Sequence, residues 1–135
     1  MNKNLEVKII RLKGGEDIIC FCYEDYVNKR ILIQYPNTFY YNIDTINDTH
    51  ELVLMDWMYK EAFAYQTIYI PSNQVLFTTM ATVTFGYKYL HKIFNELDES
   101  TELSKRIKKT LEDILTGLNE SEVDLKEHNT NPTIH

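Results

Sequence analysis

Apolar and polar residues alternate along much of 5–80, a pattern that is typical of β-strands. A strand is expected at 5–12, and it is followed by the tight-turn sequence Lys13-Gly14-Gly15-Glu16, in which glycine supplies a positive φ. Residues 17–23 place apolar side chains on both faces, so this strand is expected to be central and covered on both sides. Further extended segments are predicted at 30–34, 38–41, 51–58, 67–70 and 75–79, and the pattern assigns no element to 59–66.

The hydrophobic period changes from Thr82 onward, where apolar residues recur at helical spacing and predict two helices separated by Asp98-Glu99-Ser100. Ser100 is the expected N-cap of the second helix, and Gly117 or Asn119 can end it. The residues after 118 are polar and acidic, so 119–135 is predicted to be a disordered tail. The predicted organisation is a β domain at 1–80, helices at 81–118 that pack on or beside it, and this tail.

These segments together predict a mainly β fold. We expect a small, strongly bent antiparallel sheet of about five strands, followed by C-terminal α-helices. Such a sheet exposes the unpaired backbone groups of its edge strands, and these need to be covered. Self-association of identical chains into a ring is one way to cover them.

The composition is that of an ordinary globular domain. The chain has 135 residues, of which 44% are apolar, enough for one domain with a hydrophobic core. No apolar run approaches the roughly 18 residues that span a membrane, and residues 1–10 lack the apolar stretch of a secretory signal. We therefore expect a cytoplasmic protein with no membrane partner. Its net charge of −6 argues mildly against nucleic acid, whose binders usually carry a basic surface.

No pattern in the chain indicates catalysis, so we expect no enzyme, no catalytic residues and no cofactor. The sequence lacks a nucleophile motif, and its adjacent acidic residues are typical of solvated turns. Cys20 and Cys22 share one face of a strand without the spacing of a metal site, which favours buried structural cysteines and no metal. The basic residues of 105–109 lie among acidic ones, so a solvated helix face is a better interpretation than an RNA patch.

Two stretches resemble the sequence motifs of Sm-like proteins. Residues 12–28 resemble the first motif: Leu12-Lys13-Gly14-Gly15, an alternating segment to Tyr23, and then Glu24-Asp25-Tyr26-Val27-Asn28. Residues 70–75, Ile-Pro-Ser-Asn-Gln-Val, resemble the second motif, although Pro71-Ser72 stands where that motif has Arg-Gly. The resemblance covers about residues 5–80. The placement of helices after the sheet is similar to Sm-like proteins attributed to marine phages.

This resemblance implies a strongly bent five-stranded sheet, a small open barrel, whose fourth and fifth strands pair between neighbouring subunits. The implied partner is the chain itself, in a homo-oligomeric ring of about five to seven subunits. In such relatives two loops hold a single-stranded base at the pore. The candidate RNA-binding residues, in the two motif-like stretches and directly after the first, are Glu24, Tyr26, Asn28, Lys29, Ser72 and Asn73.

The resemblance also implies a function. The leading hypothesis is a ring that binds single-stranded RNA, uridine- or adenine-rich, and acts in RNA metabolism or phage–host regulation. The expected location is the cytoplasm of a bacterial cell or of a phage-infected host. The alternative is a ring of the same fold that binds no RNA and acts as a scaffold or protein-interaction module. The net charge favours this alternative, whereas Tyr26, Asn28 and Asn73 favour RNA.

Overall fold

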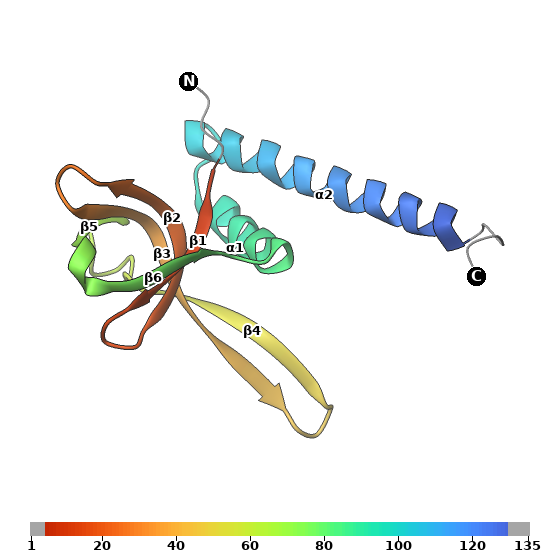
Figure 1. Ribbon diagram of the computed structural model, residues 1–135, viewed down its shortest axis with the longest axis horizontal. Helices are drawn as coiled ribbons and strands as arrows, with labels where there is room; N and C mark the ends of the chain where they lie inside the picture. The colour runs from red at the N-terminus through yellow and green to blue at the C-terminus, as the bar shows by residue number, and fades with distance from the viewer. Residues whose placement is uncertain (1–4, 130–135) are drawn as a thin grey trace. The chain divides into compact units, whose positions relative to one another are not determined.

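A computed structural model describes residues 5–129, with side chains described as far as residue 117 (Figure 1). The chain forms two compact units, and the boundary lies between Thr82 and Val83. The first unit contains β1 (Val7–Leu12), β2 (Asp17–Asp25), β3 (Arg30–Asp44), β4 (Thr49–Asp56), β5 (Thr67–Pro71), the 3₁₀ turn η1 (Ser72–Gln74) and β6 (Val75–Met80). The second contains α1 (Val83–Glu96) and α2 (Glu102–Asn129).

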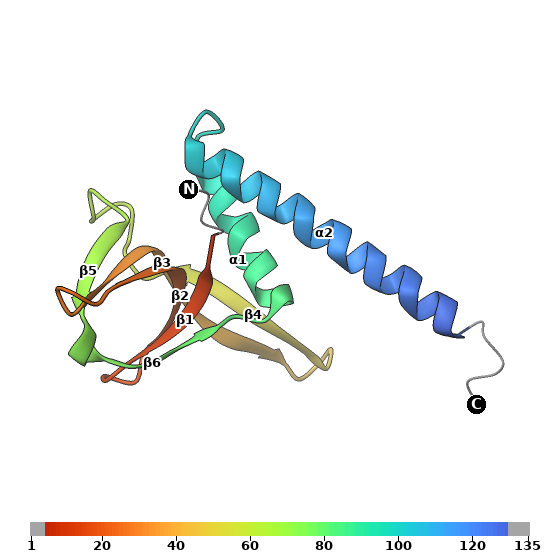
Figure 2. The same cartoon turned by 45° about the horizontal axis from the view of Figure 1, so that its top comes forward.

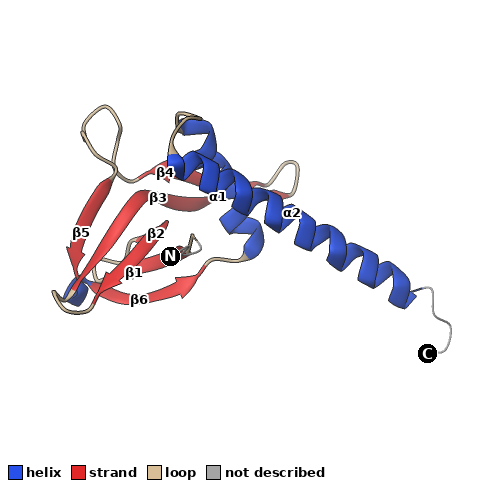
Figure 3. Ribbon diagram, turned by 90° about the horizontal axis from the view of Figure 1, so that it is seen from above, coloured by secondary structure: helices blue, strands red, loops and turns tan. Residues whose placement is uncertain are grey.

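The six described strands form one antiparallel sheet in the order β4-β3-β2-β1-β6, and β5 pairs with β3 (Figure 3). The long strand β3 pairs with two different strands in succession along one of its edges. Its first part, Arg30 to Gln34, pairs with β5, and its last part, Asn37 to Asp44, pairs with β4. Because β5, η1 and β6 are continuous, the chain passes from the strand beside β3 directly to the strand beside β1 (Figure 2).

The change of partner along β3 occurs at Tyr35 and Pro36. Tyr35 adopts a positive φ of 51°, and its N–H donates to the carbonyl oxygen of Gln66 at 2.7 Å. The carbonyl oxygen of Pro36 then accepts the N–H of Trp57 at 3.1 Å. Residues 57–66 therefore leave the sheet and return to it at this point. The sequence assigned no element to 59–66, and β4 ends at Asp56, two residues before the end of the segment expected at 51–58. The register of the β2–β3 ladder also shifts at this point. Proline has no N–H to donate to a ladder, and such an irregularity is a place where a long strand tolerates it.

The observed sheet differs from the expected one in two respects. Six strands are present where about five were expected, and β3 runs from Arg30 to Asp44, so the extended segments expected at 30–34 and 38–41 belong to one strand. The sheet is not closed by a ladder between β5 and β6 in the described chain, and the expected strong bend into a small open barrel is not confirmed. The antiparallel sheet followed by two C-terminal helices is confirmed, but the fold is mixed α/β and not mainly β, because α1 and α2 span 14 and 28 residues.

One face of β2 carries the core of the first unit. Cys20 and Cys22 are both buried on this face, and both are free thiols, as expected. Burial raises the pKa of each thiol, that of Cys22 to about 11. They pack with isoleucines from four other positions along the sheet and with one on their own strand: Ile10, Ile18, Ile31, Ile33 and Ile70. The alternation of 17–23 therefore places its apolar residues as predicted.

In the second unit α1 and α2 pack against each other. The predicted N-cap of α2 is wrong by one residue: the hydroxyl of Thr101, not Ser100, accepts the N–H of Ser104 at 3.2 Å. The Ser100 hydroxyl instead donates to the carboxylate of Asp98 at 2.9 Å, which explains the shift. The helix continues to Asn129 where a tail was expected, and residues 119–129 contain neither glycine nor proline to end it. The rest of the predicted tail, 130–135, lies outside the described residues.

Within residues 5–129, no helix combines the length and the apolar character that crossing a bilayer requires.

Candidate functional site

The turn between β2 and β3 is organised by Asp25, the last residue of β2. Its carboxylate accepts the backbone N–H of Asn28 at 3.2 Å and the Asn28 side-chain amide at 2.8 Å. The same carboxylate accepts the Nε–H of Arg30 at 3.1 Å. These hydrogen bonds, those from Asn28 first, hold the pKa of Asp25 below its usual value. Residues 26–29 are thus held as a defined turn even though they lie at the surface.

This turn exposes an aromatic ring. The side chain of Tyr26 is 81% exposed, and Val27 beside it is also exposed. A hydrogen bond with the side chain of Glu24, followed by the negative charge of that carboxylate, raises the pKa of Tyr26. The phenol is protonated at neutral pH, as its ordinary pKa of 10.0 already ensures, and the exposed ring is accessible to a planar ligand.

The turn η1 between β5 and β6 lies against the 26–29 turn. The backbone N–H of Ser72 donates to the carbonyl oxygen of Lys29 at 2.9 Å, where Lys29 has a positive φ of 52°. The other end of η1 is held by Lys13, whose N–H donates to the carbonyl oxygen of Gln74 at 2.9 Å. The glycine turn after β1, the 26–29 turn and η1 are thus linked by backbone hydrogen bonds. Both stretches that resemble Sm motifs therefore meet in space.

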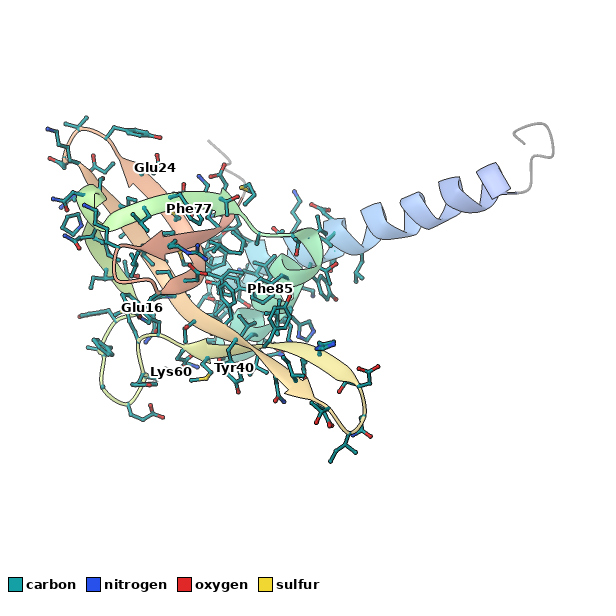
Figure 4. All side chains as sticks on the ribbon, turned by 60° about the horizontal axis from the view of Figure 1, so that its bottom comes forward. Glu16, Glu24, Tyr40, Lys60, Phe77 and Phe85 are labelled. Carbon is teal, nitrogen blue, oxygen red and sulfur yellow. The ribbon has the colours of Figure 1, made fainter. Side chains whose placement is uncertain are left out.

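A cavity of about 290 Å³ lies where these turns meet. Glu24 on β2 and Phe77 on β6, both labelled in Figure 4, contribute to its wall. The residues that line it come from both turns and from the adjoining ends of three strands: Glu24, Asp25, Tyr26, Arg30, Ile31, Ser72, Val75, Phe77 and Thr78. It combines aromatic rings, hydroxyl groups and charges of both signs. Aromatic rings can stack with a planar group such as a base, and hydroxyl and charged groups can form hydrogen bonds with it.

The structure brings together most of the residues singled out from the sequence. Glu24, Tyr26 and Ser72 line the cavity. Asn28 and Lys29 do not line it, but Asn28 binds its wall residue Asp25 and Lys29 binds Ser72 through the backbone. The sixth candidate, Asn73, lies in η1 outside the lining set, and its side-chain oxygen accepts from Gln74 at 3.5 Å.

The candidate RNA-binding residues chosen from the sequence did not include Asp25, Arg30 and Phe77, which line this cavity. The spacing Asp25-x-x-Asn28 is a local signal for a side-chain–stabilised turn, and it could have identified Asp25. Arg30 pairs directly with Asp25 across the β2–β3 ladder, a position that depends on the length of the turn. No local signal identifies Phe77, because it reaches the cavity from a strand that pairs with β1.

Charges of opposite sign lie close together at the cavity. Glu24 and Asp25 are acidic, whereas Lys29 and Arg30 are basic. The side chains that line the cavity carry a formal charge of −1, from Glu24, Asp25 and Arg30, and Lys29, outside the lining set, brings the sum of the four to zero. In the part of the chain that the structure describes, no group of three or more His, Cys, Asp or Glu side chains has the geometry of a metal site.

Comparison with models of known protein families finds no match, and no curated protein matches the chain.

Proposed function

We propose that the protein is an Sm-like protein that assembles into a homo-oligomeric ring, binds single-stranded RNA at this cavity, and acts in RNA metabolism or phage–host regulation. One observation carries the proposal. The two segments that resemble Sm motifs are far apart in sequence, yet Ser72 is hydrogen-bonded to Lys29 and shares one cavity with Tyr26. An aromatic ring, a hydroxyl group and a cationic side chain thus line one cavity.

The connection of the strands supports the Sm-like part of the proposal. β5 and β6 pair with β3 and β1, so β2, β3 and β1 lie between them in the sheet. In a flat sheet two such edges would be roughly 19 Å apart, at about 4.8 Å per strand. The three residues of η1 can reach only about 10 Å. A connection this short supports a sheet that bends its edges toward each other.

Exposed apolar side chains on the edge strands support self-association. Leu76 is 57% exposed, and further apolar side chains on β5 and β6 are exposed as well: Ile68, Tyr69, Phe77 and Met80. Apart from the ladders with β3 and β1, no pairing of β5 or β6 is present in the described residues. Pairing β5 of one copy with β6 of the next would satisfy these backbone groups and bury these side chains.

The proposed chemistry is base stacking with few hydrogen bonds. Stacking on an exposed ring such as Tyr26 contributes about 1–3 kcal/mol per base and tolerates different sequences. The Asn28 amide nitrogen is committed to Asp25, which leaves its carbonyl oxygen as an acceptor for a base edge. The hydroxyl of Ser72 can both donate and accept. A weak site of this kind gains strength when a ring repeats it around one RNA strand.

Fluorescence anisotropy with short labelled oligo-U and oligo-A, at low and at physiological salt, tests the proposal. Tyr26→Ala is expected to weaken binding about tenfold, because the stacking energy is lost. Tyr65→Ala is the matched control, since Tyr65 is 80% exposed and lies in the 57–66 segment outside the cavity lining. Absence of binding by the wild type at low salt, or an equal loss in both variants, would exclude this RNA site.

A second candidate function, a scaffold or protein-interaction module, is supported by the β3–β4 ribbon. β2 pairs with β3 only as far as Thr38, so residues 39–44 and 49–54 pair with each other alone. Residues 37–56 contain four acidic and no basic side chains other than His50, and they expose Tyr40, Tyr41, Ile43, Ile46 and Met55. Exposed apolar side chains on a two-stranded ribbon favour a protein partner. A ring that persists without any RNA binding would support this function instead.

A further inference from the structure

We infer that Arg30 supplies the phosphate-binding cation of this site, a role that rests on the proposed RNA binding. The second motif-like stretch has Pro71-Ser72 and therefore lacks a cation of its own. Arg30 comes from the start of a different strand, β3, and lines the same cavity as Ser72. Among the residues that line the cavity, Arg30 is the only one with a cationic side chain.

Two contacts fix the guanidinium of Arg30. Its Nε–H donates to the carboxylate of Asp25 at 3.1 Å, and its central carbon lies 3.8 Å from the centre of the Tyr69 ring. Among the side chains that the structure describes, none accepts a hydrogen bond from the two terminal nitrogens of Arg30. A planar guanidinium held on one edge and one face, with its other donors open, is suited to bind a phosphate.

Arg11 has the same kind of surroundings as Arg30, but one of its terminal nitrogens already donates a hydrogen bond to an aspartate. It also pairs with an aspartate and lies over an aromatic ring, with its guanidinium carbon 5.1 Å from the centre of Phe77. Asp17, however, accepts both its Nε–H at 2.7 Å and one terminal N–H at 2.8 Å, a two-pronged pair. Arg11 is not among the residues that line the cavity. Arg11 is therefore the control for Arg30, because its guanidinium also lies between an aspartate and an aromatic ring but outside the cavity lining.

The charges around Arg30 determine what it can do. Asp25 is adjacent, but two donors of Asn28 share that carboxylate, so Arg30 is not its only partner. Glu24 is the other acid of the cavity wall. With these acids nearby, Arg30 gives a short-range contact to one phosphate and not a long-range attraction for RNA. A single phosphate contact to single-stranded RNA changes the slope of log K against log salt by about 0.7.

The test measures binding of a labelled oligo-U and oligo-A to the full chain over a series of salt concentrations. Arg30→Gln is expected to weaken binding several-fold at low salt and to reduce the salt slope by about 0.7 per bound site. Arg30→Lys should retain most of the slope because it retains the charge. Arg11→Gln should leave affinity and slope unchanged. Thermal unfolding of each variant establishes that it is folded.

A second probe separates a phosphate contact from a structural effect. An oligonucleotide of the same sequence with neutral methylphosphonate linkages should bind the wild type and Arg30→Gln equally. The inference is overturned if Arg30→Gln keeps the wild-type salt slope, or if Arg11→Gln loses as much. It is also overturned if the neutral probe still distinguishes Arg30→Gln from the wild type. A wild type that binds RNA through Tyr26 without help from Arg30 leaves the proposed function standing, whereas a wild type that binds no RNA removes both.

Discussion

The backbone N–H of Ser72 donates a 2.9 Å hydrogen bond to the carbonyl oxygen of Lys29, which joins the turn after β5 to the turn after β2. Neither turn contains a hydrophobic core of its own. The hydrogen bond and the linked strands therefore determine whether Tyr26 and Ser72 face one cavity. This relationship is testable because a single substitution removes the donor without changing the strand pairing.

Ser72→Pro should destabilise the fold by about 1 kcal/mol, the usual net value of one hydrogen bond, because proline has no N–H to donate. Proline is suited to the first position of η1, since Pro71 before it is already extended, with ψ of 137°. Urea unfolding measures the loss. Ser72→Ala is the control: it lacks the same hydroxyl but keeps the N–H. Equal stability of the two variants would contradict the role of this hydrogen bond.

The carboxyl group of Asp25 should titrate below its ordinary value of 3.8, because Asn28 and Arg30 donate to its charged form. A depressed pKa in the folded state adds stability above pH 3.8, and this stability is lost as the pH falls through the folded value. A carboxyl-detected NMR titration measures the midpoint.

Arg30→Gln should raise the titration midpoint of Asp25 only part of the way towards its ordinary value, since the hydrogen bonds from Asn28 are the larger cause of the lowered pKa. Arg11→Gln should instead raise the midpoint of Asp17, which Arg11 lowers, and leave Asp25 unchanged. An Asp25 midpoint at or above its ordinary value would show that the 26–29 turn is not held by this carboxylate.

The buried thiols should make the fold sensitive to alkali. Burial raises the pKa of Cys22 from 9.0 to about 11, so the folded state keeps a proton that the unfolded state loses. This contribution is complete below pH 9 and is lost as the pH rises toward 11. We expect a decline in stability on the order of 1 kcal/mol over this range, and a flatter profile for Cys22→Ala.

The same burial should make both cysteines slow to react. An aromatic disulfide reagent at pH 8 is expected to modify Cys20 and Cys22 quickly in urea and much more slowly in the native protein, because the thiolate is the reactive form. Equal rates in the two conditions would contradict the burial of this strand face.

Leu76→Lys should reduce self-association, because it places a charge on the exposed apolar edge of β6. Light scattering coupled to size-exclusion chromatography measures the mass of the assembly. Ile46→Lys is the control, since Ile46 is 92% exposed in the turn between β3 and β4, away from this edge. A monomeric wild type would exclude the ring, and an equal effect of both variants would exclude the β6 edge as its interface.

Much of the fold could be predicted because its determinants are local. The alternation of 17–23 predicted a strand with buried cysteines, and the change of period at Thr82 predicted two helices. The errors occurred where a choice depended on a partner. Separate extended segments were expected at 30–34 and 38–41, but β3 passes through Pro36 because β4 continues the ladder. Ser100 was interpreted as a cap, but its hydroxyl is bound to Asp98.

The residues of the candidate site also divide into those that the sequence could identify and those that depend on a partner. Tyr26 and Ser72 could be named from motif-like stretches, because turn residues follow each other in a fixed order along the chain. Arg30 could not, because its significance depends on the Tyr69 ring under it and on the cavity that Ser72 also lines. These contacts join β3 to β5 and η1, which are separated in sequence by the whole of β4 and its connections.

By itself, the sequence determined that strands come first and two helices follow, since hydrophobic period and turn residues act over a few positions. It also determined that two cysteines are buried and that the chain is acidic. Only the tertiary structure decided which turns meet and which charges face each other. The physical reason is that a hydrogen bond such as Ser72 to Lys29 depends on strand register, and register is a property of the assembled sheet.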